Sequence, residues 1–285
     1  MILNKVQLLL RKNSVVMRDV DDQLMPAEKN KVNLNGWFEI GRDIQNVGDW
    51  LSKIVVDHAA ERCGIDPEKT ASKTKHLYAI GSILLGFQDA TIWGSGFLRD
   101  ITQSRCFVPY ALLHRHWHTT DVRAVRGPES RRILLKMGID CPEIYGDPAI
   151  LMPLFYMPKR LAPVPYALIP HFIDVPKYAG NPYVLHTFNN HYQQFIDRLC
   201  AAEIVYSSSL HGIILAESYG IPASLLNEQG ECPFKYRDYY HSTGRFEIPV
   251  ARSLEEAMTM TPLPVPDLSQ MQEALLNAFP RDLWD

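Results

Sequence analysis

Residues 207–212, three serines followed by leucine, histidine and glycine, are the segment of this chain best suited to chemistry. They follow a short apolar stretch that is typical of a strand and lead into an apolar, helix-like segment that ends at Gly220. A helix N-terminus carries unpaired backbone N–H groups and a partial positive charge, so it attracts anions. Histidine ionises near neutral pH, so His211 adds a proton donor there. We therefore expect a phosphate or carboxylate site with proton transfer beside it, although a buried core histidine is the alternative.

Other candidate binding segments lie where predicted strands end, the edge at which open α/β sheets bind ligands. They are residues 46–49, 80–83, 93–97, 124–128, 145–149 and 169–172. Arg126 lies between a strand and a Gly-Pro helix start, where a guanidinium can hold a phosphate or carboxylate with two hydrogen bonds. A surface ion pair is the alternative for Arg126, and ordinary turns explain Gly81 and Gly86. No segment is a Walker A loop or a complete dinucleotide fingerprint.

Two further segments invite a functional interpretation that we do not favour. Residues 114–118 contain three histidines, and alternate residues of an extended strand would share a face, but no nearby cysteine or acid completes a metal-ligand set. A partly exposed polar segment is the simpler interpretation. Residues 234–240 mix aromatic side chains with lysine and arginine. One short run of this kind is poor evidence for nucleic-acid binding and suits a sugar or an anionic small ligand as well.

The elements that position these residues alternate between strand and helix. We expect strands at 32–37, 77–80, 90–93, 121–125, 166–169, 183–186 and 203–206, and helices at 49–62, 128–137, 192–201 and 268–279. The proline-rich stretch 148–165 predicts a linker without regular structure. This pattern predicts an α/β fold of two Rossmann-like domains facing across a cleft. The predicted boundaries are 1–155, 156–265 and a C-terminal helix at 266–285 that packs back on the first domain.

Composition limits the class of protein. The chain has 285 residues, 46% hydrophobic residues and a net charge of −3, which suits an ordinary globular protein with no general attraction to nucleic acid or anionic lipid. No apolar run approaches the roughly 20 residues that span a bilayer. Five widely separated cysteines without a C-x-x-C pair argue against a disulfide framework and a structural zinc site. We expect a cytoplasmic protein without integral membrane contact.

Taken in order, these segments resemble the polysaccharide pyruvyl transferase family. The resemblance spans roughly residues 32–245 and is carried by 46–49, 80–84, 93–96, 124–128, 146–149, 169–171, 207–217, 234–235 and 238–240. It implies a two-domain fold resembling the glycosyltransferase B type. It also implies transfer of the pyruvyl group of phosphoenolpyruvate to two hydroxyls of a sugar, which forms a cyclic ketal and releases phosphate. No metal or other cofactor is expected.

The resemblance also implies roles for particular residues. His211 becomes the general acid that delivers a proton to the methylene carbon of the donor. Backbone N–H groups around Leu210 and Gly212, together with the Ser209 hydroxyl, would hold the anion. Arg126 matches a family arginine implicated in binding phosphoenolpyruvate. It would reach the donor from the first domain.

One departure from the family pattern matters. Better-studied relatives have an arginine directly before the Leu-His pair, where this chain has Ser209. Another cation must then replace that arginine, and we nominate Lys235, with His171 as second choice. Asp49 is our candidate for the base that activates the acceptor hydroxyl, and an N-cap of the following helix is the alternative for it. Residues of the other matching segments are expected to contact the acceptor, namely Asn46, Trp93 and Ser95.

The acceptor is expected to be a precursor of a cell-surface glycan such as an exopolysaccharide or capsule, linked to lipid or nucleotide or free. A lipid-linked acceptor would bring the protein to the inner face of the membrane, although nothing in the sequence encodes an anchor. Two other functions stay open from the residues alone. One is a glycosyltransferase of similar fold that uses a nucleotide-sugar donor, because fold does not decide function. The other is a glycan-binding protein without catalytic activity.

Overall fold

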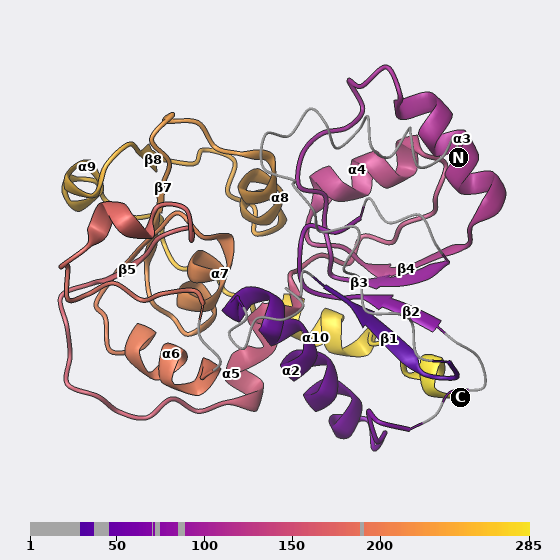
Figure 1. The fold of residues 1–285 in the computed structure, drawn as a ribbon, viewed down its shortest axis with the longest axis horizontal. Helices are drawn as coiled ribbons and strands as arrows, with labels where there is room; N and C mark the ends of the chain where they lie inside the picture. Colours follow the sequence, from indigo (N-terminus) through magenta and orange to yellow (C-terminus); the bar gives the residue numbers. More distant parts are fainter. Residues whose placement is uncertain (1–28, 37–45, 70, 72–74, 85–88, 189–190) are drawn as a thin grey trace.

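The computed structural model describes residues 29–36, 46–69, 71, 75–84, 89–188 and 191–285. Within them the chain forms two four-stranded parallel sheets covered by helices, which confirms the predicted α/β class (Figure 1). The strands of each sheet follow one another in chain order, β1-β2-β3-β4 and β5-β6-β7-β8. Parallel neighbours need crossover connections, and the helices between the strands provide most of them.

The first sheet and its helices come from the N-terminal half of the chain. The strands are β1 (Val32–Asn35), β2 (Lys75–Tyr78), β3 (Ala90–Trp93) and β4 (Thr120–Ala124). The helices are α2 (Val47–Arg62), α3 (Phe107–Trp117) and α4 (Pro128–Lys136). Two short helical turns follow, the 3-10 helix η2 (Pro148–Leu151) and α5 (Met152–Phe155).

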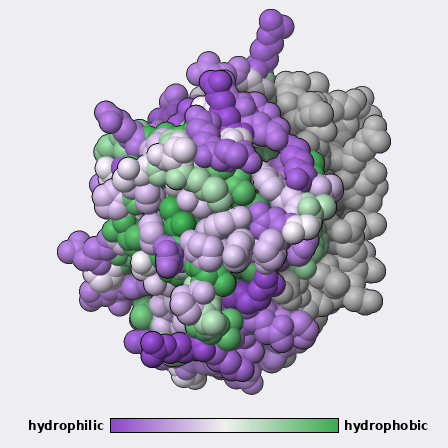
Figure 2. Space-filling model, turned by 90° about the vertical axis from the view of Figure 1, so that its left-hand side faces the viewer, coloured by the Kyte–Doolittle hydropathy of each residue, from purple (hydrophilic) through white to green (hydrophobic). Residues whose placement is uncertain are grey.

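The second sheet comes from the C-terminal half. Its strands are β5 (Ala167–Ile169), β6 (Val205–Ser207), β7 (Ala223–Leu226) and β8 (Val250–Ala251). Its helices are η3 (Val175–Tyr178), α6 (Tyr192–Leu199), α7 (Leu210–Ser218), α8 (Phe234–Ser242) and α9 (Leu254–Thr259). The face that carries α6 and α9 mixes hydrophilic and hydrophobic residues (Figure 2). The chain then ends with α10 (Ser269–Asn277) and η4 (Arg281–Trp284).

Two expectations from the sequence were wrong. The proline-rich stretch 148–165 begins with η2 and α5, because Pro148 and Pro153 occupy first-turn positions, where proline costs no helical hydrogen bond. Residues 183–186 form no strand, and Val184 makes only an isolated bridge to Leu168.

The histidine-rich segment 114–118 is a partly exposed polar segment, as expected, with His114 buried and His116 exposed. It lies mainly in helix α3, so its alternate residues do not share one face.

One apolar core runs through both halves of the chain. Side chains of α2, η2, α7 and α10 belong to the same cluster of buried residues, and η2 packs on each of the other three helices (Figure 1). Ile150 of η2 and Ile213 of α7 are fully buried. The N-terminal turns of α2 and α7 are therefore fixed relative to each other by the same packed interior.

The C-terminal segment packs on the first half of the chain. Trp93 Nε1 on β3 donates to the carbonyl of Leu275 on α10 at 2.8 Å. Trp284 Nε1 donates to the carbonyl of Pro67 at 3.2 Å. Arg123 on β4 forms an ion pair with Asp282 at 2.9 Å. The domain boundaries at residues 155 and 265 stay a prediction. Across the described residues, every helix is too short or too polar to cross a bilayer.

Candidate functional site

The site is built around the turn between β6 and α7. The backbone of Ser209 is extended, and helix α7 begins at Leu210. Gly212 N–H donates to the Ser209 carbonyl at 3.1 Å, so that amide is occupied. In the described part of the chain, the N–H groups of Leu210 and His211 have no acceptor. The first turn of α7 thus offers free donors at the positive end of the helix dipole.

Two of the three serine hydroxyls make hydrogen bonds within the protein, and one is available to a ligand. Ser207 Oγ donates to the Ile169 carbonyl at 2.8 Å and accepts the Ser209 N–H at 2.9 Å, so it fixes the turn. Ser208 Oγ accepts the backbone N–H of His171 at 2.8 Å. Among the described residues, the Ser209 hydroxyl has no hydrogen-bond partner. The Ser209 hydroxyl is therefore the one of the three that is available to a ligand, and its role in holding the anion stays a prediction.

Gly212 has a packing reason as well. A Cβ at this position would overlap Ser207 Oγ and come within 2.9 Å of Cγ2 of Ile169. Glycine therefore lets α7 lie close against β5 and β6. This close approach places the helix N-terminus at the ends of those strands.

The ring of His211 lies between the two halves of the chain. Its Nε2 faces Oδ2 of Asp147, which directly precedes η2, at 3.7 Å. Gly48, in the first turn of α2, lies against the ring, where a Cβ would overlap Nδ1 and come within 2.6 Å of the ring carbon Cγ. The His211 side chain keeps 18% exposure, whereas Asp147 has none. α2, η2 and α7 together hold this imidazole.

A cluster of cations faces the same region. Lys235, on the first turn of α8, has its pKa lowered to about 8, first by burial and then by the neighbouring charge of Arg126, with Asp49 opposing. Burial, assisted by the charge of Lys235, also lowers the pKa of His171. These mutual effects show that Lys235 lies near His171, Arg126 and Asp49. Repelling cations in a poorly hydrated place favour the binding of an anion.

Lys235 has no fixed carboxylate partner. Within the described residues its Nζ makes no hydrogen bond or close ion pair, and its one direct contact is with the Tyr236 ring, 5.1 Å from the centroid. Asp49 lies at the third position of α2, and the N-cap is Asn46, whose Oδ1 accepts the Gly48 N–H at 3.0 Å. The alternative role for Asp49, that of the N-cap, is therefore taken by Asn46.

Arg126 is fully buried and joins the two halves. Its Nε and one terminal nitrogen bind Asp238 Oδ2 of α8 at 3.1 and 3.0 Å. The other terminal nitrogen donates to Ser82 Oγ at 2.7 Å. Asp238, also fully buried, accepts the Ser130 N–H and hydroxyl at 2.9 and 2.6 Å. The surface ion pair considered for Arg126 is thus wrong, because the pair is internal. Its donor-binding role stays a prediction.

Helix α7 is anchored at its other end by Glu217. This carboxylate is 2% exposed and accepts two hydrogen bonds from Arg245, at 2.6 and 2.7 Å. It also accepts the Tyr239 hydroxyl of α8 at 2.6 Å. The Tyr236 hydroxyl ties α8 to the site turn by donating to the Ser208 carbonyl at 2.8 Å. These bonds fix Lys235, on α8, relative to the N-terminus of α7.

The three predicted acceptor residues are not brought together. Trp93 and Ser95 are fully buried, and their side chains donate to the carbonyls of Leu275 and Gly81 at 2.8 Å each. Neither presents a group that an acceptor could reach, because both belong to the packing of the first sheet. Asn46 is partly buried beside the site, where α2 meets the second half of the chain through the Val47 N–H and the Thr187 carbonyl at 2.6 Å.

The sequence analysis missed two residues of this site. Asp147 and Gly48 were each noted only as part of a matching segment. The signal for Asp147 was a carboxylate directly before a proline in such a segment. The signal for Gly48 was weaker, because a glycine inside a first helical turn gives no hint of the ring that covers it. Among the described residues no group of three metal-ligating side chains occurs.

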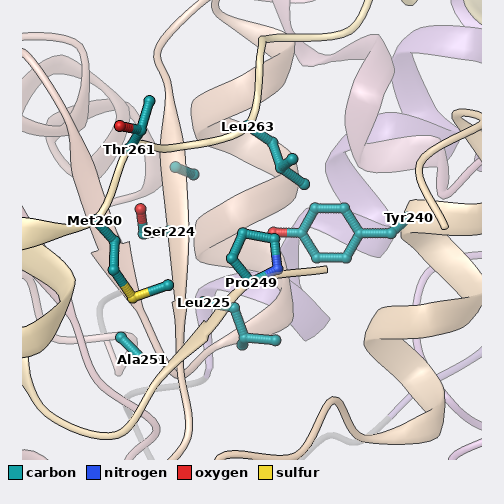
Figure 3. A pocket seen from close by; sticks show the side chains of 9 residues that line it. Ser224, Leu225, Tyr240, Pro249, Ala251, Met260, Thr261 and Leu263 are labelled. Atoms are coloured by element: carbon teal, nitrogen blue, oxygen red, sulfur yellow. The ribbon is translucent and has the colours of Figure 1, made fainter. Parts of the chain in front are cut away.

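A small cavity elsewhere in the second half is not a substrate site. It lies beside β7 and is lined by Ser224, Tyr240, Pro249 and Met260 among others (Figure 3). Its volume is about 10 Å³. A cavity of that size holds at most a single water molecule. The converging groups at the start of α7 are therefore the better candidate.

Comparison with known proteins supports the resemblance seen in the motifs. A search of curated proteins gives no match. The family model described as polysaccharide pyruvyl transferase matches residues 82–229, just over half of the chain, and this range contains Arg126, Asp147, His171 and the β6–α7 turn. The chain belongs to the polysaccharide pyruvyl transferase family.

Proposed function

We propose that this protein transfers the pyruvyl group of phosphoenolpyruvate to two hydroxyls of a glycan-precursor sugar, forming a cyclic ketal and releasing phosphate. The observation that carries this proposal is that Lys235 and His171 lie near each other next to the β6–α7 turn, which leads to the free N–H groups of α7 and to His211. Phosphoenolpyruvate carries both a carboxylate and a phosphate, and such a donor needs several cations and N–H groups at close range. Family membership supports pyruvyl transfer as the reaction.

Lys235 is the cation that we propose for the place of the family arginine missing at Ser209. It comes from α8 rather than from the β6–α7 turn, and its lack of a fixed partner leaves its charge for the donor. The Ser209 hydroxyl and the Leu210 N–H would complete the anion site. Arg126 acts nearby, through its positive charge beside Lys235 and through the position that it gives to α8.

The reaction needs one proton delivered and two removed. The His211 imidazolium gives a proton to C3 of the donor, so that a C–H bond forms and the positive charge at C2 is shared with its oxygen. The first sugar hydroxyl attacks C2, and Asp49 accepts its proton. The second hydroxyl then attacks C2 as the C–O bond to phosphate breaks, and its proton leaves with the phosphate or returns to His211. The ketal carries two sugar oxygens on one carbon.

Several finer features belong to the same proposal. The two halves would form two domains of the glycosyltransferase B type, with the site at their junction, and Asn46 would be the acceptor contact that remains. Phosphoenolpyruvate serves as co-substrate, without an added cofactor. Because it is made inside cells, we place the reaction in the cytoplasm, at the inner membrane face when the acceptor is lipid-linked. The product would enter an exopolysaccharide, a capsule or another cell-surface glycan.

Phosphate release measured with phosphoenolpyruvate and a panel of sugar acceptors tests this function. We expect release that depends on a suitable acceptor, and a loss of about 100-fold or more in His211→Ala because general acid catalysis contributes at that level. His116→Ala, at an exposed position on helix α3, is the matched control and should keep full activity. Near-normal turnover in His211→Ala would remove His211 from the acid role. Turnover of nucleotide sugars instead of phosphoenolpyruvate would show that the protein is a glycosyltransferase and not a pyruvyltransferase.

A further inference from the structure

Asp147 and His211 form an unusual buried pair. Asp147 Oδ1 accepts the Ala149 N–H at 3.0 Å and so caps η2. Its Oδ2 and the His211 Nε2 are both enclosed, and neither has a hydrogen-bond partner in the described part of the protein. They face each other at 3.7 Å. Burying polar atoms without hydrogen-bond partners costs folding free energy, so such a pair indicates a functional role.

The separation is just too long for a hydrogen bond. Good N–H···O bonds measure about 2.7–3.2 Å, so a shift of under about 1 Å would form one. Gly48 lies against the ring nearest to Nδ1, which limits movement of the ring away from Asp147. Of the two ring nitrogens only Nε2 is enclosed without a partner, and the side chain keeps 18% exposure, so Nδ1 is the nitrogen that can meet a ligand.

We propose that Asp147 is the positioning residue of His211: its Oδ2 accepts the Nε2 proton and leaves Nδ1–H as the acid that faces the donor. This assignment rests on the proposed function for the identity of the donor. In the acid step the Nδ1–H bond breaks and the C3–H bond of the donor forms. Neutral imidazole remains, with its Nε2 proton held by Asp147. A carboxylate behind the ring stabilises the imidazolium and fixes which nitrogen carries the proton.

The other charges around His211 leave this role to Asp147. Gly48, on α2, brings no charge itself, and Asp49 beside it interacts with Lys235 of α8. On α7 the carboxylate of Glu217 lies at the far end of the helix, paired with Arg245. His171, at the end of β5, also lies near Lys235. Asp147 is the anion that lies directly opposite the ring, with its Oδ2 3.7 Å from Nε2.

The wild-type protein gives the first test. With ¹⁵N-labelled histidine, NMR of the free protein identifies the protonated nitrogen of His211, assigned by comparison with His211→Ala. We expect the neutral ring to carry its proton on Nε2. A neutral ring protonated on Nδ1 would overturn the proposal. This test needs no substrate, so it stands whether or not pyruvyl transfer is the reaction.

Asp147→Asn gives the second test. The amide oxygen can still accept the Ala149 N–H and cap η2, while the charge is lost. The amide NH₂ then faces Nε2, so we expect the neutral His211 ring to carry its proton on Nδ1 instead. We expect kcat to fall about 10–100-fold, as on removal of a partner that orients a functional histidine.

Asp140→Asn, at an exposed position, is the matched control and should leave both the protonated nitrogen of His211 and kcat unchanged. A neutral His211 ring still protonated on Nε2 in folded Asp147→Asn would contradict the proposal. Absence of pyruvyl transfer in the wild-type protein, with the proton moved to Nδ1 in Asp147→Asn, would reject the proposed function and retain the Asp147–His211 pairing.

Discussion

At the scale of single residues, Lys235 shows how a binding site differs from the packed interior around it. A lysine that is largely removed from water beside a second cation costs folding free energy. Its pKa is lowered to about 8 for these two reasons. A purely structural position would be occupied by an apolar side chain or would supply a carboxylate partner. Lys235 is therefore best explained by an anion that arrives from outside.

This explanation predicts that Lys235→Met stabilises the protein and weakens donor binding. Below pH 8 the lysine is charged in both the folded and unfolded states, so the folded state carries the whole desolvation cost. Between about pH 8 and the ordinary value of 10.5 the unfolded chain holds the proton more tightly, so this penalty fades as pH rises. We expect a gain of about 1–3 kcal/mol in unfolding free energy at pH 7, shrinking towards pH 10.5.

Chemical denaturation at several pH values measures the stability change, and calorimetry with phosphoenolpyruvate measures the affinity. Lys136→Met, at an exposed position on α4, is the control and should change neither the unfolding free energy nor the affinity for phosphoenolpyruvate. If Lys235→Met is less stable than the wild type and binds phosphoenolpyruvate with normal affinity, Lys235 has a structural role and does not bind the donor.

At the scale of secondary-structure elements, the site depends on two helix N-termini meeting at one ring. α2 contributes Gly48, and α7 contributes His211, with η2 packed between the helices. Gly48→Ala is the smallest change that separates them. In an exposed helix alanine would stabilise by about 1 kcal/mol. Here its Cβ would overlap the His211 ring, so the ring must shift from its present place.

We therefore expect Gly48→Ala to fold, to bind phosphoenolpyruvate within a few-fold of the wild-type affinity, and to lose turnover by about 100-fold, because a displaced acid loses its alignment. Steady-state kinetics and circular dichroism check these three outcomes. Glu61→Ala, on the exposed last turn of α2, should behave like the wild type. Full activity in Gly48→Ala would show that the contact with His211 has no catalytic consequence.

At the scale of the whole molecule, the buried pair of Arg126 and Asp238 connects the two sheets, because one residue follows β4 and the other lies on α8. Removing one partner of a buried ion pair leaves the other charge uncompensated. We expect Asp238→Ala to lower the free energy of unfolding by about 3–5 kcal/mol, as measured by urea denaturation. Asp121→Ala, on the surface, is the control and should cost less than about 1 kcal/mol of unfolding free energy. A loss of unfolding free energy that small in Asp238→Ala would show that the buried pair does not hold the two halves together.

Sequence-based prediction found the elements with a strong local pattern, but it did not find the contacts between the two halves. Strand β3 and helices α2, α4 and α7 were predicted closely because their apolar periodicity and their glycine and proline signals are local. The two-residue strand β8 has too little pattern to be found, and β7 was missed as well.

A contact between residues far apart in the sequence cannot be predicted from the residues around either of them. Asp238 lies 112 residues from Arg126, so nothing near Arg126 indicates that its guanidinium is buried. Asp147 and Gly48 escaped for the same reason, since each matters through its contact with His211. The motifs located His211, Lys235 and His171, and only the fold showed which groups stand beside them.

The most direct test of the account is pyruvyl transfer carried out in D₂O. The wild-type protein, phosphoenolpyruvate and an active sugar acceptor should give a ketal whose methyl group carries one deuterium, with one phosphate released per ketal. That result follows from one solvent-derived proton delivered to C3, and mass spectrometry with ¹H NMR of the product measures it. A product without deuterium in its methyl group, or phosphate release that does not need the acceptor, would contradict the account.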